Sequence, residues 1–342
     1  MNDKTLNLYP IDYPFETLVN RLNAENPKLI LNPEFQRKYK WDKEGWVRAS
    51  KFIESCLMRI PLPSCYFAED QEARHVVIDG VQRITTIAKF MNNEFALEGL
   101  TTFKDLENKK FSELGPYKEE LEATTIRCIV LRKENDQSLV REIFSRLNQG
   151  AVSLSDQEIR HALYHGRFDD LLVKLAGNDS IKNFGKGPSS TVTKDSREGE
   201  EQVLRFFALI GDLDGYTDRL STYLDDFMQS QTHISEAKIL AYEKLFNKSL
   251  KNCLNVFGNT TFVDTSKSKP RQSMVYYDLL MPSLGEMTAR DAKDKNLQIQ
   301  AAFNELCNSD EFQRTLSGGL QSKSSILKRR GIWKKLLTKH LK

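Results

Sequence analysis

The spacing of apolar residues over the first half of the chain predicts short helices that alternate with strands. Between residues 46 and 60 they recur every three or four positions, which is typical of a helix with one buried face, and Pro61 ends this helix. Shorter β-rich runs indicate strands. The elements predicted in this half are helices at 15–22, 46–60, 82–92 and 138–147 and strands at 28–31, 65–68, 75–78 and 124–131.

The second half has long helical periodicities and few strand signals. Ser155 followed by Glu158 forms a capping box, which predicts the start of a helix. Residues 182–199 and 259–273 are predicted loops. The helices predicted in this half are 202–210, 216–228, 234–257 and 296–307. We therefore expect an α+β protein, with an α/β domain over residues 1–165 and an all-helical domain over residues 166–342 that ends in a basic helix.

The composition is that of a globular cytoplasmic protein. With 342 residues, 39% of them hydrophobic, the chain can bury a core without disulfides. It has no run of 18 apolar residues and no signal-peptide pattern at its N-terminus, so neither a membrane span nor secretion is expected. The five cysteines lie far apart and form no CxxC pair, which favours reduced core thiols and no structural metal.

The formal net charge of +3 is unevenly distributed. After Glu311 the chain has nine lysines and arginines and no acidic residue, while the preceding part carries a net charge of −6. A basic terminal segment suits contact with DNA or another polyanion, but it equally suits a terminal helix with a solvated basic face. The candidate DNA-binding residues are Lys328, Arg329, Arg330, Lys334 and Lys335.

The segment with the most chemical information is HVVIDGVQRITT, residues 75–86. A buried strand ends at Asp79, and a helix begins just after Gly80. A helix start offers free N–H groups and a positive dipole end, so it is a potential anion site. Arg83 could bind phosphate oxygens, and Gln82 and Asp79 could position a metal ion or water. The alternative is a tight structural turn, with Asp79 as the helix cap and Arg83 in solvent.

Two further clusters could complete a nucleotide site. In PEFQRKYKW, residues 33–41, basic side chains alternate with aromatic rings, which could contact phosphate and stack on a base. In FSRLNQG, residues 144–150, polar side chains follow the end of a helix. The alternatives are an aromatic loop that covers the core and a C-capping asparagine. The candidates from these two clusters are Gln36, Arg37, Tyr39, Trp41, Arg146 and Asn148.

Other catalytic and metal-binding patterns are weak. There is no Walker-type phosphate loop and no HExxH motif. His161 and His165 are four residues apart in a predicted helix, a spacing that could hold a metal ion. No third ligand follows at a fixed spacing, so ordinary helical histidines are the preferred interpretation and any metal ligand is unknown.

Four separated blocks occur in an order that resembles one family: FQRKYKW, IPLP, VIDGVQRITTI and IFSRLNQGAVSLSDQEIRHAL. Together they are similar to the N-terminal domain of GmrSD-type, modification-dependent restriction proteins, which is related to the ParB/sulfiredoxin fold. The resemblance is strong over residues 10–165 and weaker over 201–228. It implies binding and hydrolysis of a nucleoside triphosphate at the Asp-Gly-x-Gln-Arg turn, coupled to defence against foreign DNA. For phosphoryl transfer of this kind we expect Mg²⁺ as cofactor.

We assign catalysis to three residues of the turn and nucleotide binding to its neighbours, from the residue chemistry together with the resemblance. The catalytic assignments are Asp79, Gln82 and Arg83, and the nucleotide-binding ones add Gly80 and Thr85 to the two clusters above. Val81 stands where the family has Gln, which removes one potential amide ligand for phosphate, metal or water.

The C-terminal region lacks the His-Asn-His pattern of the nuclease domain that many relatives carry. Cleavage of DNA therefore implies a partner nuclease, and a homo-oligomer is a further expectation. Two alternatives to the hydrolase stay open. One is a non-catalytic ParB-like module that binds DNA or regulates, and the other is a nuclease that uses the same pocket.

Overall fold

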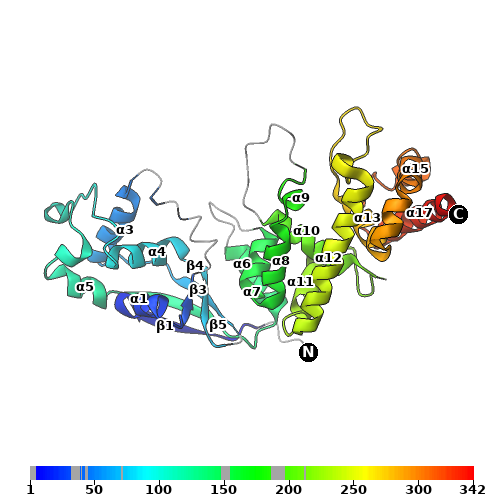
Figure 1. The fold of residues 1–342 in the computed structure, drawn as a ribbon. Coiled ribbons are helices and arrows are strands. Elements are labelled where there is room, and N and C mark those ends of the chain that lie inside the picture. Colours follow the sequence, from blue (N-terminus) through cyan, green and yellow to red (C-terminus); the bar gives the residue numbers. More distant parts are fainter. Residues whose placement is uncertain are drawn as a thin grey trace. The chain divides into compact units, whose positions relative to one another are not determined.

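The computed structural model describes residues 5–31, 39, 41–42, 45–70, 72–147, 155–185, 197–211 and 213–342. The chain divides into two compact units, residues 1–154 and 155–342, each with a hydrophobic core of its own (Figure 1). Unit 1 combines a sheet with helices, and the described part of unit 2 is helical apart from one isolated bridge, so the predicted fold class is confirmed. The sequence places the boundary at residue 165, ten residues after the start of the second compact unit.

Unit 1 contains a five-stranded mixed sheet with the order β1-β5-β3-β4-β2. The β1/β5 and β3/β4 pairs are antiparallel, and the β5/β3 and β4/β2 pairs are parallel. The strands are β1 (Leu8–Pro14), β2 (Leu29–Ile30), β3 (Cys65–Glu69), β4 (His75–Asp79) and β5 (Thr125–Leu131). Strand β4, which leads into the predicted anion-binding turn, therefore lies inside the sheet, between β3 and the short β2.

One face of this sheet is covered by helices, because β3, β4 and β5 each place buried apolar residues there. Phe67 and Val77 are fully buried among side chains of the covering helices. The predicted alternation in β5 is confirmed, since Ile126, Cys128 and Val130 are all buried. The helices of unit 1 are α1 (Phe15–Asn23), α3 (Val47–Leu57), α4 (Val81–Met91), α5 (Tyr117–Ala123) and α6 (Gln137–Leu147), with short 3₁₀ turns η1 (Lys104–Leu106) and η2 (Phe111–Glu113).

Strand β1 is an element that the hydrophobic pattern did not indicate. Its sequence, LYPIDYP, contains Pro10 and Pro14, which argue against a strand because proline cannot donate to a β-ladder. Among the described strands β1 pairs only with β5, so it lies at an edge of the sheet, where proline is tolerated.

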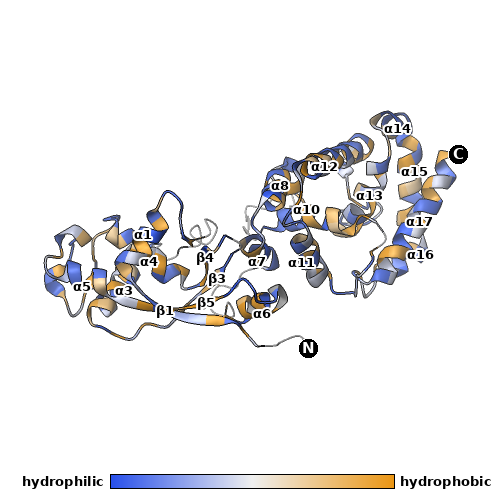
Figure 2. Ribbon diagram, turned by 90° about the horizontal axis from the view of Figure 1, so that it is seen from below, coloured by the Kyte–Doolittle hydropathy of each residue, from blue (hydrophilic) through white to orange (hydrophobic). Residues whose placement is uncertain are grey.

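Unit 2 is built from helices that carry both hydrophobic and hydrophilic residues (Figure 2). The predicted capping box is confirmed: Ser155 and Glu158 bond each other's backbone N–H at the start of α7. Its elements are α7 (Asp156–Leu163), α8 (Arg167–Ala176), α9 (Asp179–Lys182), α10 (Glu198–Leu209), α11 (Leu220–Ser230), α12 (Glu236–Phe257), η3 (Gly258–Thr260), α13 (Met274–Glu286), α14 (Ala289–Asp294), α15 (Asn296–Cys307), α16 (Asp310–Arg314) and α17 (Lys323–Leu341).

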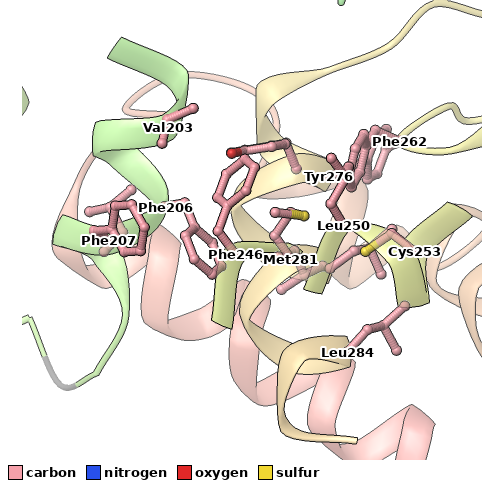
Figure 3. Close-up of a cluster of buried hydrophobic side chains, with 14 of the residues drawn as sticks. Val203, Phe206, Phe207, Phe246, Leu250, Cys253, Phe262, Tyr276, Met281 and Leu284 are labelled. Atoms are coloured by element: carbon pink, nitrogen blue, oxygen red, sulfur yellow. The ribbon is translucent and has the colours of Figure 1, made fainter. Parts of the chain in front are cut away.

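The centre of unit 2 is an aromatic cluster contributed by α10, α12 and α13 (Figure 3). The rings of Phe206 and Phe246 meet edge to face with centroids 5.3 Å apart, and both residues are buried. Met281 and Leu284 of α13 are fully buried in the same cluster, in keeping with the predominantly apolar sequence of this helix. Among the described helices, none combines the length and apolar character needed to cross a lipid bilayer.

The five cysteines are all buried with free thiols, as predicted.

In unit 1, the buried carboxylate of Glu54 on α3 binds the backbone of the loop that follows Leu100. Its Oε1 accepts backbone N–H groups of Thr101 at 2.8 Å, Thr102 at 2.6 Å and Phe103 at 3.2 Å, and Lys51 pairs with Oε2. Burial alone would raise the pKa of Glu54, but these bonds lower it to about 2.

We expect Glu54 to make unit 1 acid-sensitive. A folded pKa below the ordinary value means that its stabilisation is complete above about pH 4.5 and is lost as the pH falls toward 2. Glu54→Gln should therefore destabilise the protein at pH 7 by about 1–3 kcal/mol and shrink the difference from wild type at pH 3. Denaturant unfolding at both pH values measures this, and an equal loss at each pH would contradict it. Glu122→Gln is the control, because it makes the same chemical change in a carboxylate that forms only a partly exposed pair with Lys118.

Candidate functional site

The predicted anion-binding turn lies where β4 passes into α4. Gly80 has φ of +96°, a left-handed conformation that side chains disfavour. A Cβ at this position would also collide with Sγ of Cys65 on the neighbouring strand β3. The first hydrogen bond of the helix runs from Ile84 N to Gly80 O at 2.9 Å, so α4 begins directly after the glycine.

Arg83 binds to protein groups around this turn. Its guanidinium donates to Asp79 Oδ2 at 2.9 Å, to Ser64 O at 3.3 Å and to Pro63 O. Its side chain is 14% exposed, whereas that of Asp79 is 40% exposed. Arg83 therefore ties the turn to the segment that leads into β3. The alternative interpretation of the turn, with this arginine in solvent, is wrong on that point.

A cavity of about 600 Å³ lies beside α4, between α1 and β2. Two of the predicted nucleotide-binding residues line it, Tyr39 and Thr85, while Asp79, Gly80 and Arg83 do not. Charged side chains from several elements also face it. The charged lining residues are Asp42, Arg74, Lys89 and Glu94. A cavity of this size and polarity suits a small polar ligand.

Inside this cavity the two predicted residues differ in their hydrogen bonding. Tyr39 OH lies 2.7 Å from Thr86 Oγ1, and burial raises the pKa of the phenol to about 12, so it stays protonated at neutral pH. Thr85 Oγ1 is buried and has no hydrogen-bond partner among the described residues. An unsatisfied buried hydroxyl is costly unless water or a ligand bonds to it. Thr85 thus combines a place in the cavity lining with an unsatisfied hydroxyl group.

Two other predicted residues of this unit, Trp41 and Arg146, contact protein groups away from the turn. Trp41 packs against Phe52 with centroids 5.4 Å apart, and Arg48 lies over its ring, which leaves less of the indole for a base to stack on. Arg146 is exposed on α6 and pairs with Glu142. Gln36, Arg37 and Asn148 lie outside the described residues. Gln82 is half-buried in the first turn of α4, and its backbone carbonyl accepts from Thr86 at 2.8 Å.

The basic residues of α17 divide into two groups. Arg329 is buried and donates to the carbonyls of Thr315 and Leu320, and Arg330 donates to those of Leu209 and Gly211. Burial keeps Arg329 away from DNA, contrary to the expectation, whereas Arg330 is half-buried with its guanidinium on backbone carbonyls. The exposed predicted residues are Lys328, which is 3.7 Å from Glu311, and Lys334 and Lys335, which line a shallow hollow on α17.

One group of side chains was only half recognised from the sequence. His161 and His165 lie beside Asp169, a buried residue of the next helix, α8. The signal in the sequence was the spacing His-x₃-His-x₃-Asp. It could not be read as one helical face, because α7 ends at Leu163 and α8 begins at Arg167.

The sheet, the glycine turn and the cavity define unit 1 as a mixed α/β domain with a candidate anion-binding turn. Residues 15–165 match the family model described as GmrSD restriction endonuclease, N-terminal domain. The N-terminal region is therefore a domain of this restriction-endonuclease family, as the sequence motifs predicted. The match covers less than half of the chain and leaves most of unit 2 outside it. No curated protein and no solved structure matches the chain.

The site geometry depends on the missing side chain at position 80. Gly80→Ala should destabilise the protein by about 1–3 kcal/mol more than Gly115→Ala, because both have positive φ but only Gly80 faces a neighbouring atom. Urea unfolding of the two variants measures the difference. Gly80→Ala should lower the free energy of unfolding less in a Cys65→Ala background than in the wild-type protein. Equal costs for the two glycines would show that Cys65 imposes no constraint.

Proposed function

We propose that unit 1 binds a nucleoside triphosphate at the Asp79–Arg83 turn and hydrolyses it, and that this activity serves restriction of foreign DNA. The observation that carries the proposal is the strand–glycine–helix turn with Arg83 in its first turn, within a domain of a restriction-endonuclease family. The start of a helix suits phosphate oxygens, since its N–H groups lie at the positive end of the helix dipole.

In this proposal Arg83 is a phosphate ligand that already has a fixed position. Its bonds to Pro63, Ser64 and Asp79 hold the guanidinium beside the start of α4, and an arginine has five N–H donors to share. Asp79, which is partly exposed, would hold Mg²⁺ or orient water, and Gln82 would assist it. Phosphoryl transfer requires mainly positioning and charge neutralisation, and these groups supply both.

The cavity beside α4 supplies the rest of the proposed ligand site. Thr85 is two residues beyond Arg83 on the same helix, and its buried hydroxyl gives a ligand one directed contact. Tyr39 presents a protonated phenol to the same space. We propose that the nucleoside portion occupies this cavity while its phosphates reach the turn.

Phosphate release from ATP, GTP, CTP and UTP with Mg²⁺ tests this function. Arg83→Ala should reduce turnover roughly 100-fold or more, since removing one donor to a transition-state oxyanion has an effect of that size. Arg127→Ala, whose side chain pairs with Asp12 on the exposed part of the sheet, should leave turnover unchanged.

Thermal unfolding of each variant separates loss of catalysis from loss of fold, because Arg83 also bonds two backbone carbonyls. A folded Arg83→Ala protein with wild-type turnover would contradict the assignment. An inactive wild type that still binds nucleotide would favour the non-catalytic alternative, consistent with Val81 in place of the family's Gln.

The exposed lysines of α17 support a second function, the binding of duplex DNA by unit 2. Lys328, Lys334 and Lys335 are all exposed on this helix, and only the first is paired with an acidic residue among those described. Such a surface binds phosphate groups without reading base sequence.

Replacing Lys334 and Lys335 by Glu should weaken duplex binding. The slope of log K against log salt should become shallower by about 1 for each phosphate that the variant no longer neutralises. Fluorescence anisotropy over a salt series gives this slope. Lys244→Glu with Lys248→Glu makes the same charge change on exposed positions of α12. An equal effect in both double variants would show that only net charge matters, and unaltered binding in the α17 variant would exclude this surface.

A further inference from the structure

The junction between α7 and α8 in unit 2 gathers two histidines around a buried aspartate. Nδ1 of His165 lies 3.3 Å from Asp169 Oδ2, and Nδ1 of His161 lies 2.6 Å from the same oxygen. One potential donor atom from each residue lies within 4.8 Å of the other two. We propose that His161, His165 and Asp169 bind a divalent transition-metal ion of the Zn²⁺ class, independently of the proposed nucleotide site.

The donor set favours this class of ion. Two imidazole nitrogens and one carboxylate oxygen are ligands that Zn²⁺ and its neighbours accept, whereas Mg²⁺ and Ca²⁺ prefer oxygen alone. Two ligands of one tetrahedral Zn²⁺ lie about 3.4 Å apart, given bonds of about 2.1 Å. The His165–Asp169 separation is close to that value. The His161–Asp169 contact is shorter, so binding requires the His161 ring to move by less than about 1 Å or to use Nε2.

The buried carboxylate is the second observation that points to a ligand. Asp169 is completely buried, and its Oδ1 has no hydrogen-bond partner among the described residues. Nδ1 of His161 is also buried and, although close to Oδ2, has no hydrogen-bond partner of its own among the described residues. A buried acceptor and a buried ring nitrogen left in this way are destabilising unless a proton, water or metal ion satisfies them.

A second buried carboxylate interacts with Asp169. Glu200 of α10 is buried nearby with Arg197 as its partner, and burial together with the Asp169 charge raises the pKa of Glu200. A divalent cation at Asp169 would reduce the repulsion between the two carboxylates. His165 is 60% exposed, so the ion would face solvent on one side and keep a water as its fourth ligand.

Zinc binding by the full chain tests the proposal. After removal of metal with EDTA, isothermal titration with Zn²⁺ should show one site in wild type. His165→Ala should weaken binding at least tenfold, and it should stay folded because this side chain is largely exposed. Asp169→Asn should weaken it as well. His233→Ala removes an exposed histidine of the same unit and should bind as wild type does.

Two further measurements separate this site from adventitious binding. Saturating Zn²⁺ should raise the Tm of wild type and of His233→Ala but not of His165→Ala, because only a ligand of the folded state stabilises it by mass action. Co²⁺ in place of Zn²⁺ should give visible d–d bands without a thiolate charge-transfer band, since the ligands are nitrogen and oxygen. Absence of a stoichiometric site in wild type, or wild-type affinity in His165→Ala, would overturn the proposal.

Discussion

The arrangement of unit 1 depends on the close approach of two strands at a position without a side chain. Gly80 follows β4 directly against Cys65 of β3, and only glycine combines that contact with a φ of +96°. The chain can therefore turn into α4 immediately, so the helix lies on the sheet and buries Ile84 and Ile87. Arg83 then reaches back to Pro63 and Ser64 and fixes the entry to β3. The requirement for glycine at position 80 thus fixes the positions of β3, β4 and α4 and of the guanidinium group of Arg83.

Most helices and strands of the fold could be predicted because their buried faces follow a simple period. The 46–60 pattern became α3 (Val47–Leu57), and the alternation at 124–131 became β5. Strand β1 could not be predicted, because its two prolines contradict strand propensity and only its edge position accommodates them. Helix α13 was also missed, since its sequence is mostly apolar and has no continuous polar face to give it a period.

The candidate site was predictable where it depends on local sequence and unpredictable where it depends on packing. The Asp-Gly-x-Gln-Arg turn was located from the residues themselves, and Gly80 has the left-handed conformation that such a turn requires. Which side chains come to lie near this turn depends on tertiary structure. Thr85 and Tyr39 face a common cavity, whereas Trp41 is packed against Phe52. The buried Arg329 likewise looked like its exposed neighbours in the sequence, because charge alone does not reveal burial.

Arg160 shows that the unit of family similarity and the unit of folding are different segments of this chain. This arginine lies within the matched residues 15–165, yet it is completely buried in unit 2, where it donates to Asp225 at 2.7 Å and to Glu201 at 2.9 Å. A buried cation without its carboxylates costs several kcal/mol. A fragment that stops at residue 165 would carry this charge with no partner from α10 or α11. Any recombination that exchanges the region after the matched domain must therefore supply both acids, so the two halves are expected to be inherited together.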